Sequence, residues 1–452
     1  MRSTVRKLAF ALSLIGVAAG CVDESIVYRD RDLFENPLPA ALSFVGYTSQ
    51  TDTLTVCGNC HVSAQAQWQA TNHAGAWGTL QESGYAQSFC EGCHTVNQLG
   101  NPETEIAGHS ATGEVRYQDV QCESCHGAGL AHINNPNKET VPLAQMAVDT
   151  LTGCGECHQG DHHPFVNQWA ESGHGQFNAF PAGRDGCQDC HTGEGALRLF
   201  GVNTNYLEKD DVDQANQHLP ITCAVCHDPH GSEDSGQLRY PIDFPSVDVN
   251  LCMQCHQKRG SPDLDAANRG PHSPEGPTIL GTAGWFPPGL QSPILSTHGS
   301  TDQNPRLCAG CHVESYEITD EVTGEFVFNA TGHSFEATPC VDVQGVPVPG
   351  PCDSDAKSYR SCTECHSEEV AEGLVETAEA SVAPLITELE GLLALVDPGE
   401  FDPDDGVYTV AEGAQFNLDL AETSGSVVHN AFLIRSLLNA SIAEVRRFYG
   451  LP

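Results

Sequence analysis

The stretch Cys57-Gly-Asn-Cys60-His61 is the first of nine copies of one pattern, Cys-x-x-Cys-His, and these copies decide the fold. They are called motifs 1 to 9 in chain order. Their cysteines are Cys57 and Cys60, Cys90 and Cys93, Cys122 and Cys125, Cys154 and Cys157, Cys187 and Cys190, Cys223 and Cys226, Cys252 and Cys255, Cys308 and Cys311, and Cys362 and Cys365. Their histidines are His61, His94, His126, His158, His191, His227, His256, His312 and His366. All nine pairs are followed by histidine, although only 21 of the 452 residues are histidine, so the pattern marks one repeated chemical site.

Cys-x-x-Cys-His is the attachment pattern of c-type haem. The two thiols form thioethers with the vinyl groups, and the adjacent imidazole becomes the proximal ligand of the iron. Half a zinc ribbon or a redox dithiol also uses Cys-x-x-Cys, but neither needs histidine at the next position. The sequence therefore predicts nine covalently bound haems, and the porphyrins must form much of the core.

The fold class expected around these haems is mainly irregular, with short helices and very little β structure. The chain contains 44 glycines and 27 prolines, and long periodic segments are missing before about residue 368. Beyond that point apolar residues recur at helical spacing over 368–396 and again over 426–448, on either side of an acidic turn. We therefore expect a C-terminal helical hairpin that packs on the last haems.

The motif spacing predicts an internal repeat. The first five motifs lie 32 or 33 residues apart, and the element aromatic-x4-His recurs as Trp68–His73, Trp169–His174 and Phe328–His333. The expected division is a signal peptide of lipoprotein type (1–20), an N-terminal tether (21–56), a three-haem unit (57–150), a three-haem unit with one extra haem (151–300), a two-haem unit (301–367) and the helical hairpin (368–452).

The first residues predict export. A basic start is followed by an apolar run over 8–19 that is too short to cross a bilayer. Ala18-Ala19-Gly20-Cys21 resembles a bacterial lipoprotein cleavage site, which makes Cys21 a lipidation site and predicts an exported outer-membrane lipoprotein. The alternative is ordinary signal cleavage nearby, which releases the protein. Outside the cytoplasm spare thiols can oxidise, so we expect a disulfide between Cys340 and Cys352.

The net charge limits the classes of partner that the protein can bind. Sixty acidic residues against 20 basic ones give a net charge of −40, which repels nucleic acid and anionic lipid. Such a surface attracts cations or basic redox proteins, or serves solubility in salty surroundings. Two acidic groups are candidate calcium ligands, or solvated loops: Asp210, Asp211 and Asp213, and Asp402, Asp404 and Asp405.

Twelve histidines remain after the nine proximal ligands, enough to give every iron a second imidazole. The candidates for this distal position are His73, His132, His162, His163, His174, His230, His272, His298, His333 and His429. Three Cα steps from His227 to His230 span at most about 11 Å, too little to pass around a porphyrin rim. Such a histidine should therefore serve a neighbouring haem. His109 and His218 match no position in the repeats and are treated as spares.

Three segments carry a resemblance to a known family: Cys122-Glu-Ser-Cys-His126-Gly-Ala-Gly with His132, Cys223-Ala-Val-Cys-His227-Asp-Pro-His230, and Val428-His429-Asn430. The chain resembles the multihaem cytochrome c superfamily, which includes cytochrome c-554, hydroxylamine oxidoreductase-like proteins, pentahaem nitrite reductases and extracellular multihaem electron-transfer cytochromes. The resemblance covers residues 57 to about 450 and implies closely packed haems that conduct electrons. No Cys-x-x-Cys-Lys occurs, which counts against nitrite reduction.

Three functional hypotheses follow. The leading one is an electron-transfer conduit at the outer membrane or cell surface, without substrate chemistry of its own, which passes electrons between other cytochromes and an external acceptor. The second is an oxidoreductase with one five-coordinate haem that acts on a small nitrogen or sulfur species. The third is a subunit of a polymeric extracellular cytochrome filament. Only three methionines are present, so the Met/His ligation that raises haem potential can at most be exceptional.

Overall fold

The computed structural model describes residues 43–47, 56–145, 148–149, 151–160, 163–202, 218–264, 269–319, 326–341, 352, 356–402 and 407–452. Several predictions from the sequence lie outside these residues: the signal peptide, Cys21, His162, and all the candidate calcium ligands except Asp402.

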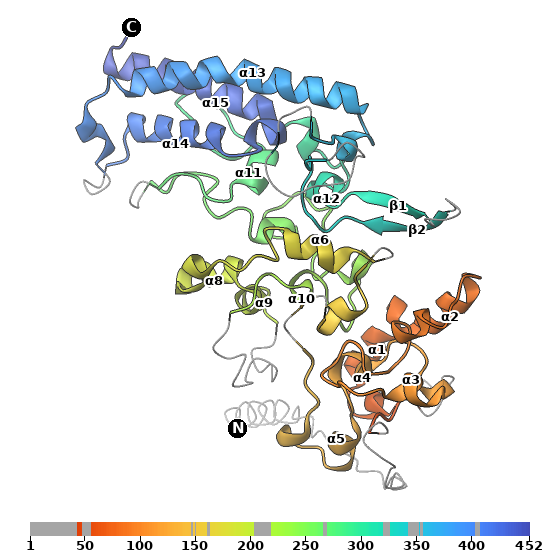
Figure 1. Ribbon diagram of the computed structural model, residues 1–452. Coiled ribbons are helices and arrows are strands. Elements are labelled where there is room, and N and C mark those ends of the chain that lie inside the picture. Colours follow the sequence, from red (N-terminus) through yellow and green to blue (C-terminus); the bar gives the residue numbers. More distant parts are fainter. Residues whose placement is uncertain are drawn as a thin grey trace, which may run out of the picture. The chain divides into compact units, whose positions relative to one another are not determined.

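The α-helices that the structure describes before residue 368 are short, with four to seven residues each, and Figure 1 shows how they follow one another. They are α1 (Val62–Trp68), α2 (Ala76–Glu82), α3 (Gly108–Thr112), α4 (Cys122–His126), α5 (Leu130–Asn134), α6 (Phe165–Glu171), α7 (Ala179–Ala182), α8 (Asp185–His191), α9 (Gly193–Leu199), α10 (Cys223–Cys226), α11 (Glu275–Ile279) and α12 (Cys308–His312). Irregular chain connects them. The predicted fold class, mainly irregular with short helices, is confirmed.

Each motif occupies a single helical turn. Motifs 3, 5, 6 and 8 lie on α4, α8, α10 and α12, and motifs 1, 2, 4, 7 and 9 lie on or enter 3-10 turns. Residues three positions apart share one face of a helical turn, so both sulfurs of a motif can reach the same haem. The local structure therefore follows directly from the spacing of the two cysteines.

Apart from isolated bridges, the β structure of the described residues is one antiparallel hairpin between motifs 8 and 9. Strand β1 (Ser315–Thr319) pairs with β2 (Phe326–Thr331), and Ser315 lies opposite Thr331. Cys340 and Cys352 form a disulfide with their Cα atoms 5.9 Å apart. In the described residues, this small sheet and the disulfide lie in the segment that leads to the last motif.

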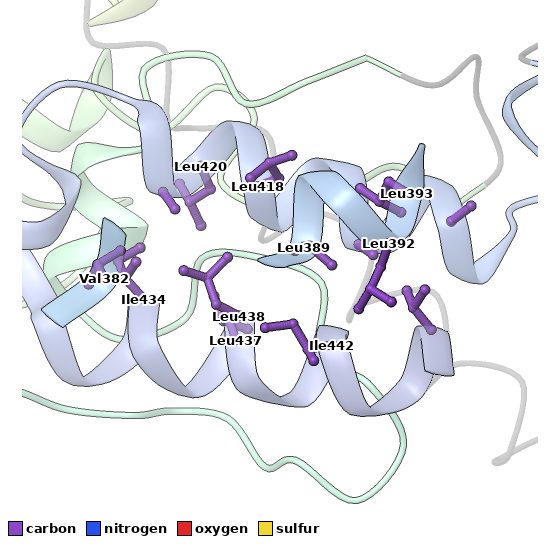
Figure 2. Close-up of a cluster of buried hydrophobic side chains, with 14 of the residues drawn as sticks. Val382, Leu389, Leu392, Leu393, Leu418, Leu420, Ile434, Leu437, Leu438 and Ile442 are labelled. Atoms are coloured by element: carbon purple, nitrogen blue, oxygen red, sulfur yellow. The ribbon is translucent and has the colours of Figure 1, made fainter. Parts of the chain in front are cut away.

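The C-terminal region contains both predicted helices, α13 (Glu368–Leu393) and α15 (Ser426–Tyr449), and a third that the sequence analysis missed, α14 (Val410–Glu422). The expected hairpin is therefore a three-helix unit. Its side chains form the largest apolar cluster of the described residues, which includes Leu389, Leu420 and Leu437 (Figure 2). Helix α14 was missed because it buries polar groups, and the amide of Asn417 bonds to the backbone of Trp285.

Elsewhere the described residues contain only small apolar clusters of three or four buried side chains. One surrounds Tyr117, one Val225 and one Met253. Clusters of this size bury too little apolar surface to hold a chain of this length together. The segments that carry the motifs must therefore be held together by something else.

Candidate haem-binding sites

A single continuous cavity of about 3240 Å³ is lined by cysteines or histidines of motifs 2 to 9. Ordinary small-molecule pockets measure roughly 300–1,000 Å³, so this space is large enough for several cofactors. Seven of the candidate distal histidines also line it: His73, His163, His174, His272, His298, His333 and His429. The donor set and the volume both fit porphyrins attached at the motifs.

Seven motif histidines face a second imidazole. The ring centroids are separated by 6.3 Å for His61 and His132, 6.3 Å for His126 and His230, 6.1 Å for His158 and His73, 6.0 Å for His191 and His272, 6.2 Å for His227 and His333, 6.1 Å for His256 and His174, and 6.2 Å for His312 and His429. A metal–imidazole bond is about 2 Å long and the ring centre lies about 1 Å beyond the nitrogen. Two imidazoles on one metal therefore have centroids about 6 Å apart, the separation seen in all seven pairs.

Two histidines that follow a motif closely, His132 and His230, lie beside other motifs. His230 faces His126 of motif 3, although it follows motif 6 by three residues, and His132 faces His61 of motif 1. This is the arrangement expected from the length of chain between such neighbours. His132 and His230 each link two motifs. Each follows one motif closely in the chain, and its ring lies about 6 Å from the motif histidine of another.

The remaining histidines are placed differently. His163 lies 6.0 Å from His158, which also faces His73, and Nδ1 of His298 lies 2.9 Å from the backbone oxygen of Val428. Among the described residues, His94 and His366 have no second imidazole at the 6 Å spacing.

The two spares contact other side chains. His109 is buried against Trp77, with ring centroids 5.2 Å apart, and its Nδ1 lies 3.8 Å from Glu91 inside motif 2. His218 bonds to Glu194. Both contacts are compatible with a structural role for these two residues.

Backbone carbonyls orient several motif imidazoles. Nδ1 lies 2.9 Å from the oxygen of Ala76 in His94, 3.0 Å from that of Pro142 in His126, 2.6 Å from that of Gly236 in His227 and 2.7 Å from that of Phe335 in His312. Because a carbonyl only accepts, Nδ1 must carry the proton, and Nε2 keeps the lone pair that binds metal. These contacts hold the rings in the tautomer that haem ligation requires.

Burial keeps several of these imidazoles neutral. It lowers the pKa of His158 to about 3 and the pKa of His174 and His429 to about 4. The exception is His256, whose pKa is raised by its hydrogen bond to Glu275, with Nδ1 and Oε2 3.3 Å apart. Neutral imidazole is the ligating form, so buried rings are ready to bind iron at any ordinary pH. Sequence analysis did not identify Glu275.

Sulfur atoms of different motifs meet in pairs. Hydrogen-bonding contacts join Cys57 to Cys122, Cys93 to Cys157, Cys154 to Cys223, Cys190 to Cys255 and Cys252 to Cys308. Three more pairs lie within electrostatic range: Cys125 with Cys154, Cys226 with Cys252, and Cys311 with Cys362. Because a c-type haem is attached at its edge through these sulfurs, haems held at such neighbouring motifs would have their edges close together. Together the eight pairs link all nine motifs in one branched network.

Two family models match parts of the chain. Residues 56–127 match the model for cytochrome c554 and c-prime, and residues 218–261 match the model for a doubled CXXCH motif. The first match covers motifs 1 to 3, and the second covers motifs 6 and 7. No solved structure matches this chain.

Curated relatives are also multihaem proteins. The chain is 26% identical over 296 residues to C-type polyheme cytochrome OmcB of Geobacter sulfurreducens, an alignment that covers 57% of this chain and 35% of that protein. It is 26% identical over 164 residues to multiheme cytochrome MtrA of Shewanella baltica, covering 32% of this chain and 44% of that protein. The chain thus spans less than half the length of these relatives. With the motifs, the ring pairs and these matches in agreement, the chain belongs to the superfamily of multihaem c-type cytochromes.

Proposed function

We propose that this electron-transfer cytochrome carries nine c-type haems, most or all with two axial imidazoles, and conducts electrons from one end of the series to the other. The observation that carries the proposal is the set of seven histidine pairs at the spacing of a shared metal. Two strong ligands per iron favour electron transfer over substrate binding, because no coordination position stays open.

The sulfur contacts support a route. They connect motifs 1, 3, 4, 6, 7, 8 and 9 in that order, and join motif 2 to motif 4 and motif 5 to motif 7. The main line would carry electrons through seven haems, with the haems of motifs 2 and 5 as side branches. Among motifs 1 to 7 these links repeat with a period of three motifs, as the sequence repeat does, and the links from motif 7 to 8 and from 8 to 9 depart from it.

The repeat also supports an axial ligand for motif 2. His272 follows motif 7 and faces His191 of motif 5. His163 stands in the corresponding place after motif 4, and both His163 and His94 line the cavity. We assign His163 to the haem of motif 2 on this ground. Of the two candidates that remain, His162 lies outside the described residues, and we assign His298, which lines the same cavity as His366, to the haem of motif 9.

The proposed location is the outer membrane, through lipidation of Cys21. The disulfide between Cys340 and Cys352 is consistent with an oxidising compartment. No helix among the described residues has the length and apolar character needed to cross a membrane. Replacement of Cys21 by Ser should move the protein from the membrane fraction to the soluble fraction without loss of haem. An unchanged distribution would contradict lipid anchoring.

The haem count and the spin state test the central proposal together. The intact mass of the purified protein should exceed that of the mature chain by nine haems, and electron paramagnetic resonance of the oxidised protein should show low-spin iron only. A high-spin signal together with cyanide or nitrite binding would instead support an enzyme that acts on a small nitrogen or sulfur species. Filaments in electron micrographs of sheared cell-surface material would support the polymeric alternative.

A further inference from the structure

The aromatic residue of the repeated aromatic-x4-His element makes the same contact in both three-haem units. The indole Nε1 of Trp68 donates to the backbone oxygen of Val120 over 2.9 Å, and that of Trp169 donates to Ile221 over 2.7 Å. Both bonds span 52 residues. A side-chain bond repeated at the same separation is part of the repeat and not an accident of one loop.

The residue that accepts the indole bond also holds the distal histidine. The backbone N–H of Val120 donates to the oxygen of His73, and that of Ile221 donates to the oxygen of His174, each over 3.1 Å. The backbone C=O and N–H of Val120 and of Ile221 are therefore both hydrogen-bonded within the element. The turn between the tryptophan and the histidine is closed in the same way twice, since the Thr71 and Ser172 hydroxyls donate to the tryptophan oxygens over 2.8 and 2.7 Å.

We call the tryptophan, the turn that ends at the histidine and the acceptor residue a clamp. Each clamp contacts two haem sites. Val120 and Ile221 stand two residues before the first cysteines of motifs 3 and 6. His73 faces His158 of motif 4, and His174 faces His256 of motif 7. Each clamp thus joins the last motif of a three-haem group, motif 3 or 6, to the motif that follows it, motif 4 or 7. At the same places Cys125 approaches Cys154 and Cys226 approaches Cys252.

We propose that Trp68 and Trp169 are positioning residues that set the two junctions between haem units, by holding the axial histidine that crosses each junction. The inference rests on the proposed axial ligation. The indole N–H bonds to a backbone oxygen that is tied, through the same peptide segment, to both the histidine and the following motif. Loss of that single bond frees the histidine turn while the apolar contacts of the ring remain.

The third copy of the element has no such clamp and serves a different site. The phenyl ring of Phe328 carries no N–H, and His333 faces His227 of motif 6 and not motif 4 or motif 7. The backbone N–H of His333 donates to Oε1 of Gln168 over 2.8 Å, and Gln168 is the neighbour of Trp169 on α6. Helix α6 therefore holds ligands for two adjacent haems, at motifs 6 and 7.

The test is Trp169→Phe in the full holoprotein, with carbon monoxide as the probe. Carbon monoxide binds reduced haem only where an axial position is open. We expect carbon monoxide bound per chain to rise by one over the wild type, with a new high-spin signal in the oxidised protein. Trp68→Phe should give the same increase through the haem of motif 4. Ser172→Ala, which weakens the same turn with a smaller change, should give a partial increase.

Trp77→Phe is the matched control, because the Trp77 indole packs against His109 and is not part of a clamp. It should bind no more carbon monoxide than the wild type. If Trp169→Phe, Trp68→Phe and Ser172→Ala all retain the wild-type stoichiometry with a full haem count, the positioning role is wrong. A haem count below nine in the wild type would instead contradict the proposed function. The two failures are therefore distinguished by the haem count.

Discussion

At the scale of single residues, Glu123 shows how the chain is fastened where apolar side chains are few. Its carboxylate lies inside motif 3, is 4% exposed, and accepts from the backbone N–H groups of Val45, Gly46 and Gly129 over 2.7–3.0 Å. Burial raises the pKa of Glu123, while these bonds oppose the shift. One side chain thus ties a remote segment, Val45 and Gly46, and the turn that follows the motif to a haem motif.

Glu123→Ala should therefore lower the free energy of unfolding by more than an ordinary surface change. Each buried N–H left without an acceptor costs about 1–3 kcal/mol. The measurement is denaturant unfolding of the holoprotein, followed by haem absorbance. Glu139→Ala, at an exposed position, is the control and should stay close to the wild type. Equal midpoints for the two variants would contradict this role of Glu123.

Glu275 tunes a single haem in our assignment. Its carboxylate bonds to Nδ1 of His256, and a charged acceptor makes an imidazole a stronger donor to iron, which stabilises the ferric state. Glu275→Gln should raise the midpoint potential of one haem, that of motif 7, by some tens of millivolts, measured by spectroelectrochemical titration. Glu103→Gln, an exposed change in the first unit, should leave all nine potentials in place. A titration curve identical for both variants would refute the assignment.

At the scale of elements, α15 presents its histidine by breaking its own helix. Asn430 has φ −160° and ψ 80°, so the turn with His429 is separated from the helix that follows. The Asn430 side chain accepts from Leu433 N–H over 3.0 Å, as an N-cap does, and donates to the oxygens of Thr278 and Ile294. This places His429 opposite His312.

Asn430→Ala should cost about 0.5–2 kcal/mol through the lost cap, with more from the two unpaired carbonyls. It should also release His429, which would appear as a high-spin signal from one haem. Asn439→Ala lies on the exposed side of the same helix, where its amide bonds to Arg435, and serves as the control. A destabilised Asn430 variant that keeps nine low-spin haems would show that the kink supports the fold alone.

At the scale of the whole molecule, two kinds of core hold different parts of the chain. The C-terminal unit of α13, α14 and α15 has a continuous apolar core, whereas the motif-bearing segments surround the 3240 Å³ cavity. Haem attachment supplies in the second part what leucine packing supplies in the first.

Chain produced without haem attachment should therefore lose structure unevenly. We expect circular dichroism of this apoprotein to retain helical signal from the C-terminal unit, and limited proteolysis to leave a protected fragment that begins near residue 368. The holoprotein under identical conditions is the reference. Complete loss of helix would show that even α13 to α15 need the haems, and full protection would show that the haems are dispensable for folding.

The sequence alone determined the chemistry at each motif, because two thiols and an imidazole within five residues form their site locally. It also determined the short helical turns and the residues at which α13 and α15 begin, which follow from cysteine spacing and apolar periodicity. Tertiary structure decided which imidazole meets which. His230 faces His126, and His333 faces His227, across distances along the chain that no local pattern encodes. It also decided the existence of α14, whose Glu412 and Asn417 appear solvent-facing in the sequence but are buried, because their partners come from Thr409, Trp285 and Ser441.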